Sequence, residues 1–302
     1  PAASLLPRRR LRRKTAKTAG ETALCALHFR EGRVKLRGMV IDFHTHIFND
    51  ELAPKARAAL IKNSHGAYHH CTDMTRAGLL GYMDAHGIDK SVVLSIATKP
   101  TQVGKINAWA SAIASDRLIP FGAVYPLSDG WRADIDDIVA RGFKGIKLHP
   151  EYQGFYVDDE SLFPFYEYAF SKGLIILWHA GYDPVGTPPY RSNPRRFAAL
   201  AERFDGAKMV VAHLGGQEQW VETAEFLAGK NVYMDTSMAT KYCPKDLFEF
   251  IVKKHGADKT LFASDSPWSD TAEAAEMIRG CDFTDEEKES ILHGAAEKLL
   301  GC

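Results

Sequence analysis

The sequence predicts an α/β protein that folds as a single (β/α)8 barrel, the TIM barrel. After residue 38, short apolar, β-branched runs alternate with longer helical patterns, as expected for parallel strands joined by crossover helices. An open doubly wound sheet would show the same alternation, but no glycine-rich phosphate motif follows the first strand. Roughly 260 residues in eight strand-helix units also match the size of a closed barrel.

The eight candidate strands are rich in apolar and β-branched residues. They span residues 40–43, 91–96, 119–125, 143–148, 174–178, 208–212, 231–235 and 260–264. Apolar residues recur at helical spacing between several of them, which predicts helices over 74–86, 102–115, 134–141, 194–204 and 244–255. Three histidines that lie in helical patterns are expected at the surface, namely His86, His255 and His293.

The first 38 residues differ from the rest in charge. They hold 11 of the 38 Lys and Arg residues and only 2 of the 38 Asp and Glu residues, so residues 39–302 are acidic although the chain is neutral. We expect residues 1–38 to form a basic N-terminal tail, disordered or of upstream origin, and residues 39–302 to form the barrel domain. An organelle transit peptide or a nucleic-acid arm would also be basic, but an acidic body repels phosphates.

Composition excludes several other classes of protein. Hydrophobic residues make up 45% of the chain and charged residues 25%, a globular balance, and no apolar window of about 18 residues offers a membrane span. The five cysteines include no CxxC pair, so neither a disulfide framework nor a thiolate zinc site is indicated. We therefore expect a cytoplasmic protein that binds a small molecule, without nucleic-acid or membrane partners; a homodimer stays open.

Polar residues stand where the predicted strands end, and the active site of a barrel lies at that end. His44 and His46 are two residues apart in an extended segment, so both imidazoles can face one point and bind one metal ion. His179 and His213 each follow an apolar run and precede a glycine-containing turn. For any one of these histidines alone, an incidental loop residue or a satisfied core residue is the competing interpretation.

The charged strand-end residues allow several roles. Asp265 could bind the metal, take a proton from bound water, orient a histidine, or cap a helix. Lys147 and His149 share one face of the fourth strand. Lys147 could hold a substrate carboxylate, act with a lowered pKa, become carbamylated between two metals, or reach the solvent at the rim. Asp235 could support the site or bind strand-end backbone.

Five segments together resemble a known family. They are Asp42-Phe43-His44-Thr45-His46, Gly145-Ile146-Lys147-Leu148-His149-Pro150, His179-Ala180-Gly181, Ala212-His213-Leu214-Gly215-Gly216 and Ala263-Ser264-Asp265-Ser266-Pro267. The pattern is similar to the amidohydrolase-related (amidohydrolase 2) family, which includes the aminocarboxymuconate-semialdehyde decarboxylases, and it covers residues 39–302.

The resemblance implies a mononuclear divalent-metal site with an adjacent acid/base residue, His213. The implied ligands are His44, His46, His179 and Asp265. Several relatives place a glutamate on the fourth strand, where this chain has Lys147 and His149, so a second metal stays open.

The leading functional hypothesis is metal-dependent hydrolysis of a small-molecule C–N or C–O bond, in an amide, lactone or ester. Zinc is the expected cofactor, with manganese possible. His213 and Asp265 would be the catalytic residues, and the substrate would be recognised by Lys147, His149, Arg191 and Trp268. The alternative is a metal-dependent lyase, a non-redox decarboxylase or hydratase acting on a small carboxylic acid. A nuclease or a non-enzymatic metal-binding protein are further alternatives.

Overall fold

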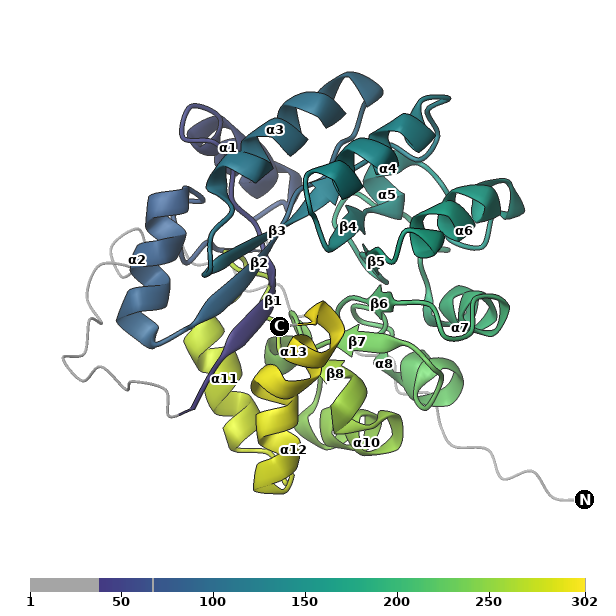
Figure 1. The fold of residues 1–302 in the computed structure, drawn as a ribbon. Coiled ribbons are helices and arrows are strands. Elements are labelled where there is room, and N and C mark those ends of the chain that lie inside the picture. Colours follow the sequence, from purple (N-terminus) through teal and green to yellow (C-terminus); the bar gives the residue numbers. More distant parts are fainter. Residues whose placement is uncertain (1–37, 67, 302) are drawn as a thin grey trace, which may run out of the picture. The chain divides into compact units, whose positions relative to one another are not determined.

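Eight parallel strands form one sheet in sequence order, from β1 to β8 (Figure 1). The computed structural model describes residues 38–66 and 68–301, which all belong to one compact unit. The predicted barrel is confirmed, and each predicted strand is present with shifted ends. The strands are β1 (Ile41–Thr45), β2 (Lys90–Leu94), β3 (Leu118–Ala123), β4 (Gly145–Leu148), β5 (Ile175–Trp178), β6 (Met209–Val211), β7 (Tyr233–Asp235) and β8 (Thr260–Leu261).

The predicted boundary at residue 38 falls at the edge of the described chain. Residues 1–37 lie outside the described residues, and with them nearly all of the predicted basic tail. None of the helices in the described part of the chain has both the length and the hydropathy that a membrane crossing needs.

The barrel closes between β1 and the segment that continues from β8. Backbone hydrogen bonds join Phe43 N to Phe262 O at 2.9 Å and Asp265 N to His44 O at 2.9 Å. The buried Asp42 carboxylate crosses the same seam, where it accepts hydrogen bonds from the backbone N–H and the hydroxyl of Ser264 at 3.0 and 2.5 Å. Closure therefore brings His44 and Asp265 side by side.

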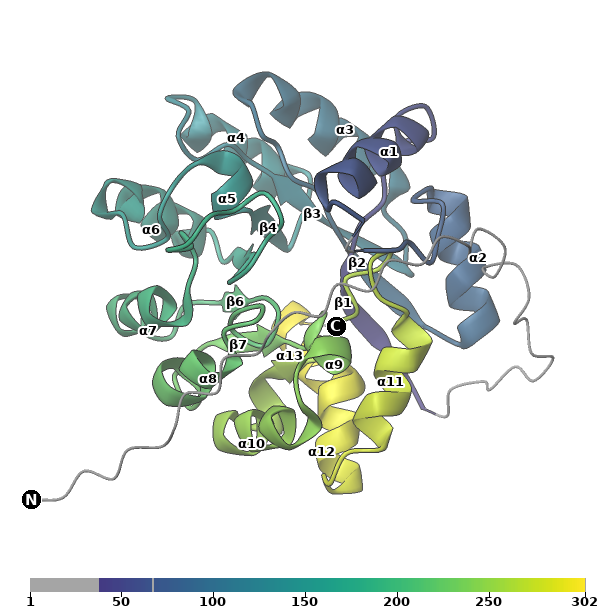
Figure 2. The same cartoon turned by 180° about the vertical axis from the view of Figure 1, so that it is seen from behind.

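Helices surround the strands on the outside (Figures 1 and 2). The five predicted helices correspond to α2, α3, α4, α7 and α10, whereas α6 after the fourth strand, α8 after the sixth and α11 after the eighth were not located from the sequence. One of these, α6, has the aromatic-rich sequence FPFYEYAFS, whose helical period is hard to see. The helices are α1 (Ala53–Asn63), α2 (Arg76–His86), α3 (Val103–Ile113), α4 (Trp131–Ala140), α5 (Pro150–Gln153), α6 (Phe163–Ser171), α7 (Pro194–Arg203), α8 (Trp220–Glu222), α9 (Ala239–Tyr242), α10 (Lys245–His255), α11 (Thr271–Arg279), α12 (Asp285–Glu289) and α13 (Ala295–Leu300).

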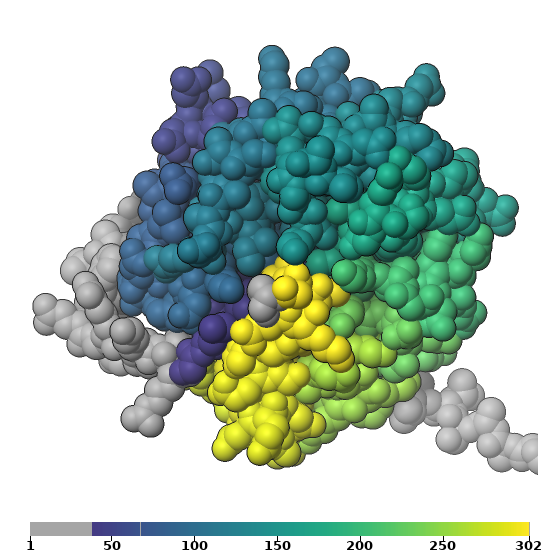
Figure 3. All heavy atoms as spheres, viewed as in Figure 1, coloured from purple at the N-terminus to yellow at the C-terminus, as the bar shows by residue number. Residues whose placement is uncertain are grey.

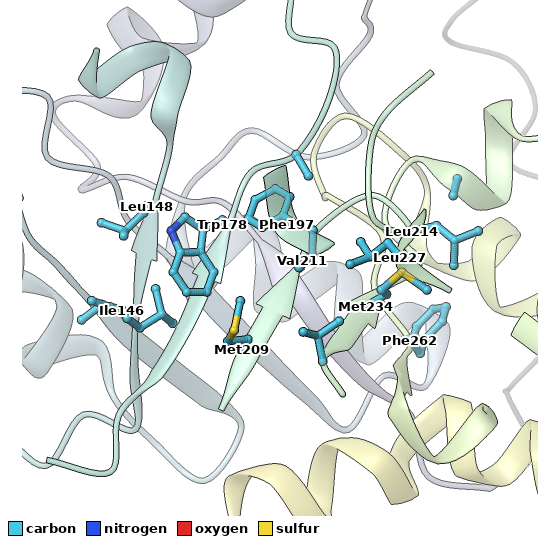
Figure 4. Packing of buried hydrophobic residues seen from close by; sticks show 14 of the residues in the cluster. Ile146, Leu148, Trp178, Phe197, Met209, Val211, Leu214, Leu227, Met234 and Phe262 are labelled. Atoms are coloured by element: carbon cyan, nitrogen blue, oxygen red, sulfur yellow. The ribbon is translucent and has the colours of Figure 1, made fainter. Parts of the chain in front are cut away.

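Strand alternation separates the two larger of the three clusters of the core. In β5, Ile176 and Trp178 point outward and pack against the helices, in the cluster drawn in Figure 4. Ile175 and Leu177 point into the barrel, where they share an inner cluster with residues of α13. Figure 3 shows the C-terminal helices covering one end of the barrel, so the opposite end, where the strands have their carboxyl ends, is left for a site.

The same alternation determines which polar residues face inward. Lys147 in β4 lies between the outward-facing Ile146 and Leu148, and it is only 1% exposed. His179 continues the inward series of Ile175 and Leu177. One expectation about histidines is wrong: His255, at the end of α10, is buried at 6% exposure rather than lying at the surface.

Candidate active site

A cavity of about 130 Å³ lies at the carboxyl ends of the strands. It brings together eight of the nine residues that the sequence predicted for the site, from β1, β4, β5, β6 and the segments that follow these strands and β8. These residues are His44, His46, Lys147, His149, His179, His213, Asp265 and Trp268.

Arg191 is the predicted residue that the structure does not bring to the cavity. Its guanidinium Nη1 lies 3.1 Å from Oε2 of Glu151, and its backbone N–H donates to the other oxygen of the same carboxylate at 2.6 Å. The Glu151 side chain is buried, so Arg191 is committed to neutralising it. Arg191 is therefore paired with Glu151 and does not line the cavity, and its role in substrate binding stays a prediction.

Three donor atoms converge at one point in the cavity. Nε2 of His44 and Nε2 of His46 are 3.1 Å apart. Oδ1 of Asp265 lies 3.3 Å from the first nitrogen and 3.1 Å from the second. These three residues come from β1, from the residue that follows it and from the segment after β8, so the seam that closes the barrel also assembles this triad.

The hydrogen bonds that Nδ1 of His44 and Nδ1 of His46 make determine whether each Nε2 carries a hydrogen or a lone pair. Nδ1 of His44 lies 2.9 Å from Oδ2 of Asp235, and Nδ1 of His46 lies 2.8 Å from the carbonyl oxygen of Leu94. Both partners are acceptors, so each Nδ1 carries the hydrogen and each Nε2 carries a lone pair. Two lone pairs and a carboxylate oxygen directed at one point repel each other unless a cation lies between them. The donor set therefore fits a divalent metal ion.

His179, the fourth predicted ligand, is close by but makes other contacts. Its Nδ1 lies 2.9 Å from Nε2 of His213, and its ring stacks on that of His149 with centroids 4.1 Å apart. The donor atoms of His149, His179 and Asp183 form a second group that could hold a cation. Nε2 of His179 is buried and makes no hydrogen bond with the described residues, which leaves it available to a ligand.

His213 lies behind His179. The resemblance implied that His213 is the acid/base residue, yet its Nε2 lies 2.9 Å from Nδ1 of His179. His213 is also 2% exposed, and burial lowers the pKa of its imidazole well below the usual value, as it does for His44 and His179. This geometry suits a residue that orients His179 better than one that meets a reactant.

Lys147 is the one Lys or Arg among the described residues that line the cavity. Its ammonium Nζ lies 3.2 Å from Nε2 of His44. Burial lowers the pKa of Lys147 to about 8, although the carboxylates of Asp235 and Asp265 oppose that shift. A buried, partly desolvated cation next to three metal-donor atoms is equipped to bind an anionic substrate group.

Aromatic residues form much of the remaining wall. Tyr68 and Trp268 have ring centroids 6.3 Å apart, and Tyr152 packs edge-on against His149 at 4.2 Å. The sequence indicated Trp268 but missed Tyr68 and Tyr152. Tyr68 is followed directly by His69 and His70, and neither of these histidines lines the cavity.

The backbone at the site is strained. His213, Met238 and Asp265 have φ values of 59°, 59° and 69°, in the left-handed region that non-glycine residues avoid, and all three line the cavity. Such conformations persist where the surrounding structure holds them, and they concentrate at functional sites. Gly181 after β5 has a φ of 83°, and a Cβ there would collide with the backbone of Gln217, so glycine is needed where the ends of β5 and β6 approach.

Comparisons with known proteins identify the family and the fold. The amidohydrolase family model matches residues 41–302, while no curated protein sequence matches the chain. The solved structure of 5-carboxyvanillate decarboxylase from Novosphingobium aromaticivorans, complexed with manganese and 4-hydroxy-3-methoxy-5-nitrobenzoic acid, is 16% identical, with a TM-score of 0.67 over 87% of this chain and 96% of that chain.

Two further solved structures show the same fold. The 2,6-dihydroxybenzoate decarboxylase from Rhizobium is 16% identical over 87% of this chain and 98% of that chain, with a TM-score of 0.62. An uncharacterized TIM-barrel protein from Bordetella bronchiseptica is 20% identical over 87% of this chain and 99% of that chain, with a TM-score of 0.70. At such identities the likeness establishes the fold, and the chemistry has to be argued from the site.

Proposed function

This chain belongs to the amidohydrolase family, and from that premise we propose that it is a metal-dependent, non-redox decarboxylase of a small aromatic carboxylic acid. This replaces hydrolysis, the leading hypothesis from the sequence, with its alternative. Two of the similar structures are described as decarboxylases of benzoic acid derivatives, and one of them holds manganese and a nitrobenzoic acid.

The observation that carries the proposal is the position of Lys147. A hydrolase for neutral amides or esters has little use for a buried ammonium group in its cavity, because burying that charge costs stability. A carboxylate substrate would offset that cost by forming an ion pair with the ammonium group. The walls beside Lys147 include Tyr68, Tyr152 and Trp268, which suit the flat faces of an aromatic ring.

His44, His46, His179 and Asp265 would hold the divalent metal. When bound, the ion supplies a Lewis acid that withdraws electron density from the oxygen atoms of the substrate. The similar structure with manganese makes Mn²⁺ the first choice, and the nitrogen and oxygen donors of this site also accept Zn²⁺.

The residues of the chain then have distinct tasks. Lys147 binds an anionic oxygen of the substrate, and the aromatic wall orients the ring and excludes water. The bond between the ring and the carboxyl carbon breaks, carbon dioxide leaves, and the electron pair stays on the ring carbon, which takes up a proton. Asp265, whose carboxylate lines the cavity, holds and transfers that proton. His213 keeps His179 in position.

The test is product analysis. Protein loaded with Mn²⁺ or Zn²⁺ is incubated in D₂O with a panel of hydroxylated benzoic acids, and a parallel panel contains esters, lactones and amides. We expect carbon dioxide release with one deuterium on the ring carbon, and we expect the His46→Ala variant to lose both metal and activity. Hydrolysis of a member of the second panel, without carbon dioxide from the first, would overturn the proposal and restore the hydrolase.

A further inference from the structure

A buried hydrogen-bond network lies behind the metal-donor histidines and is centred on the end of β7. We propose that Asp235 and Ser237 fix the tautomers of His44, His213 and His179, so that the Nε2 lone pairs of the expected ligands are set before any cation binds. Both are positioning residues, because they act through the histidines and touch no reactant. The inference rests on the metal centre of the proposed function but not on the reaction.

The Asp235 carboxylate accepts every hydrogen bond that reaches it. Its Oδ1 receives the backbone N–H groups of His213 at 3.0 Å and Ser237 at 3.1 Å, together with the Ser237 hydroxyl. Its Oδ2 lies 2.9 Å from Nδ1 of His44. Asp235 is fully buried, so no solvent competes for these positions. Nδ1 of His44 must therefore carry the hydrogen.

The Ser237 hydroxyl extends this constraint to a second histidine. A hydroxyl has one hydrogen, and here Asp235 receives it. The Ser237 oxygen makes two other contacts, 2.8 Å from Nδ1 of His213 and 3.2 Å from Nδ1 of His44, and in both the imidazole must donate. A neutral His213 with its hydrogen on Nδ1 has a lone pair on Nε2.

His179 is the last histidine whose tautomer the network determines. Nε2 of His213 can only accept, so the contact of 2.9 Å to Nδ1 of His179 requires the hydrogen to be on His179. This leaves a lone pair on Nε2 of His179, which is the buried nitrogen without a hydrogen bond among the described residues. One carboxylate on β7 thus orders imidazoles on three other elements of the barrel.

The opposite direction of the network is unfavourable. If Ser237 donated its hydrogen to His213, its oxygen would face the close Asp235 oxygen with no hydrogen between them. A proton on Asp235 would relieve that contact, but both carboxylate oxygens already face N–H donors, which a protonated oxygen would oppose. Every donor in the network has an acceptor only when Ser237 donates its hydrogen to Asp235.

The Asp235→Asn variant tests the proposal with almost no change in shape. The amide oxygen of the asparagine should take the place of Oδ1, which accepts from two backbone N–H groups and the Ser237 hydroxyl. The amide NH₂ group must then face Nδ1 of His44. His44 then has to accept at Nδ1 and carry its hydrogen on Nε2, where the lone pair was. Long-range ¹H–¹⁵N correlation spectra of the metal-free full chain distinguish the two tautomers directly. Calorimetric titration with Mn²⁺ should show an affinity about 10- to 100-fold below wild type.

Ser237→Ala separates the two branches of the network. We expect it to release His213 and His179 into mixed tautomers while His44 keeps its hydrogen on Nδ1, and we expect Ser237→Thr, which retains a hydroxyl, to restore the wild-type spectrum. Thr236→Val is the matched control, because the Thr236 hydroxyl is equally buried but bonds only to the backbone of Ala263. It should leave the histidine nitrogens unchanged.

The wild-type spectrum decides the matter even if a variant fails to fold. Hydrogen on Nε2, or mixed tautomers, at His44, His179 or His213 in metal-free wild type would overturn the proposal, as would an Asp235→Asn protein with unchanged His44 nitrogens and Mn²⁺ affinity. These spectra need no substrate. A protein with the expected tautomers that decarboxylates nothing would refute the proposed function and leave this inference intact.

Discussion

Replacing Lys147 with methionine should stabilise the metal-free protein at pH 7 and lower its catalytic efficiency. Methionine has a similar length and an unbranched, apolar side chain, so it can occupy the volume of a lysine that is 1% exposed. Burial lowers the pKa of Lys147 from 10.5 to about 8, which means that the folded state disfavours the ammonium form. A residue without charge avoids that penalty.

The size of the effect follows from linkage. A shift of about 2.5 pKa units corresponds to about 3 kcal/mol at pH 7, where lysine is charged in both the folded and the unfolded state. The variant also loses the hydrogen bond to His44, which lowers its stability by about 1 kcal/mol. We therefore expect Lys147→Met to be about 2 kcal/mol more stable than wild type at pH 7. Because the folded pKa is lowered, wild type gains stability between pH 8 and 10.5, so the advantage of the variant should fall to near zero by about pH 9.5.

Urea unfolding of both proteins in the presence of a chelator, at pH 7 and at pH 9.5, measures this difference, and other titrating groups cancel in the comparison. The same variant should lose about 10- to 150-fold in kcat/KM for an anionic substrate, the worth of one hydrogen bond to a charged group. A variant less stable than wild type at pH 7, or an advantage that does not shrink at higher pH, would refute the reasoning.

Three further changes test other parts of the structure. Burial lowers the pKa of His255 to about 4, so the stability that its neutral form provides above pH 6.5 should be lost as the pH falls toward 4, by about 3 kcal/mol, and urea unfolding of His255→Leu should lack this loss. Arg191→Met should leave Mn²⁺ affinity within about twofold but lower unfolding stability by about 1–3 kcal/mol, because it leaves the buried Glu151 carboxylate unpaired; a large loss of affinity would return Arg191 to the site. Trp268→Ala should raise KM for an aromatic acid about 5- to 10-fold, about 1 kcal/mol of ring contact, with metal binding unchanged, and an unaltered KM would remove Trp268 from the substrate wall.

The sequence predicted the fold and most of the site because both follow from local regularities. Strand alternation alone places Lys147 and His179 inside the barrel, and the carboxyl ends of the strands gather at one end of a barrel whatever the loops do. The predicted triad members His44, His46 and Asp265 meet for this reason. The bulge in β1 between Asp42 and Thr45 did not obscure the pattern.

The sequence did not reveal the contacts between segments that are far apart in the chain. Arg191 has the charge of a substrate-binding residue, but its partner Glu151 lies 40 positions earlier, and nothing local reveals that pairing. The role of His213 depends on which atom touches His179, which no spacing rule supplies. Ser237 was visible two residues after Asp235, in the segment that follows β7, and its network could be recognised only from three-dimensional distances.

The proposed metal ion would bind at the seam that closes the barrel. The first and last strands are joined by a few backbone hydrogen bonds and the Asp42 carboxylate, and the nearest metal donors, His44 and Asp265, lie on opposite sides of that joint. A bound cation would link the two sides of this joint and stabilise the closed barrel. Metal removal should therefore speed amide hydrogen exchange first along this joint, and only later in the helices far from it.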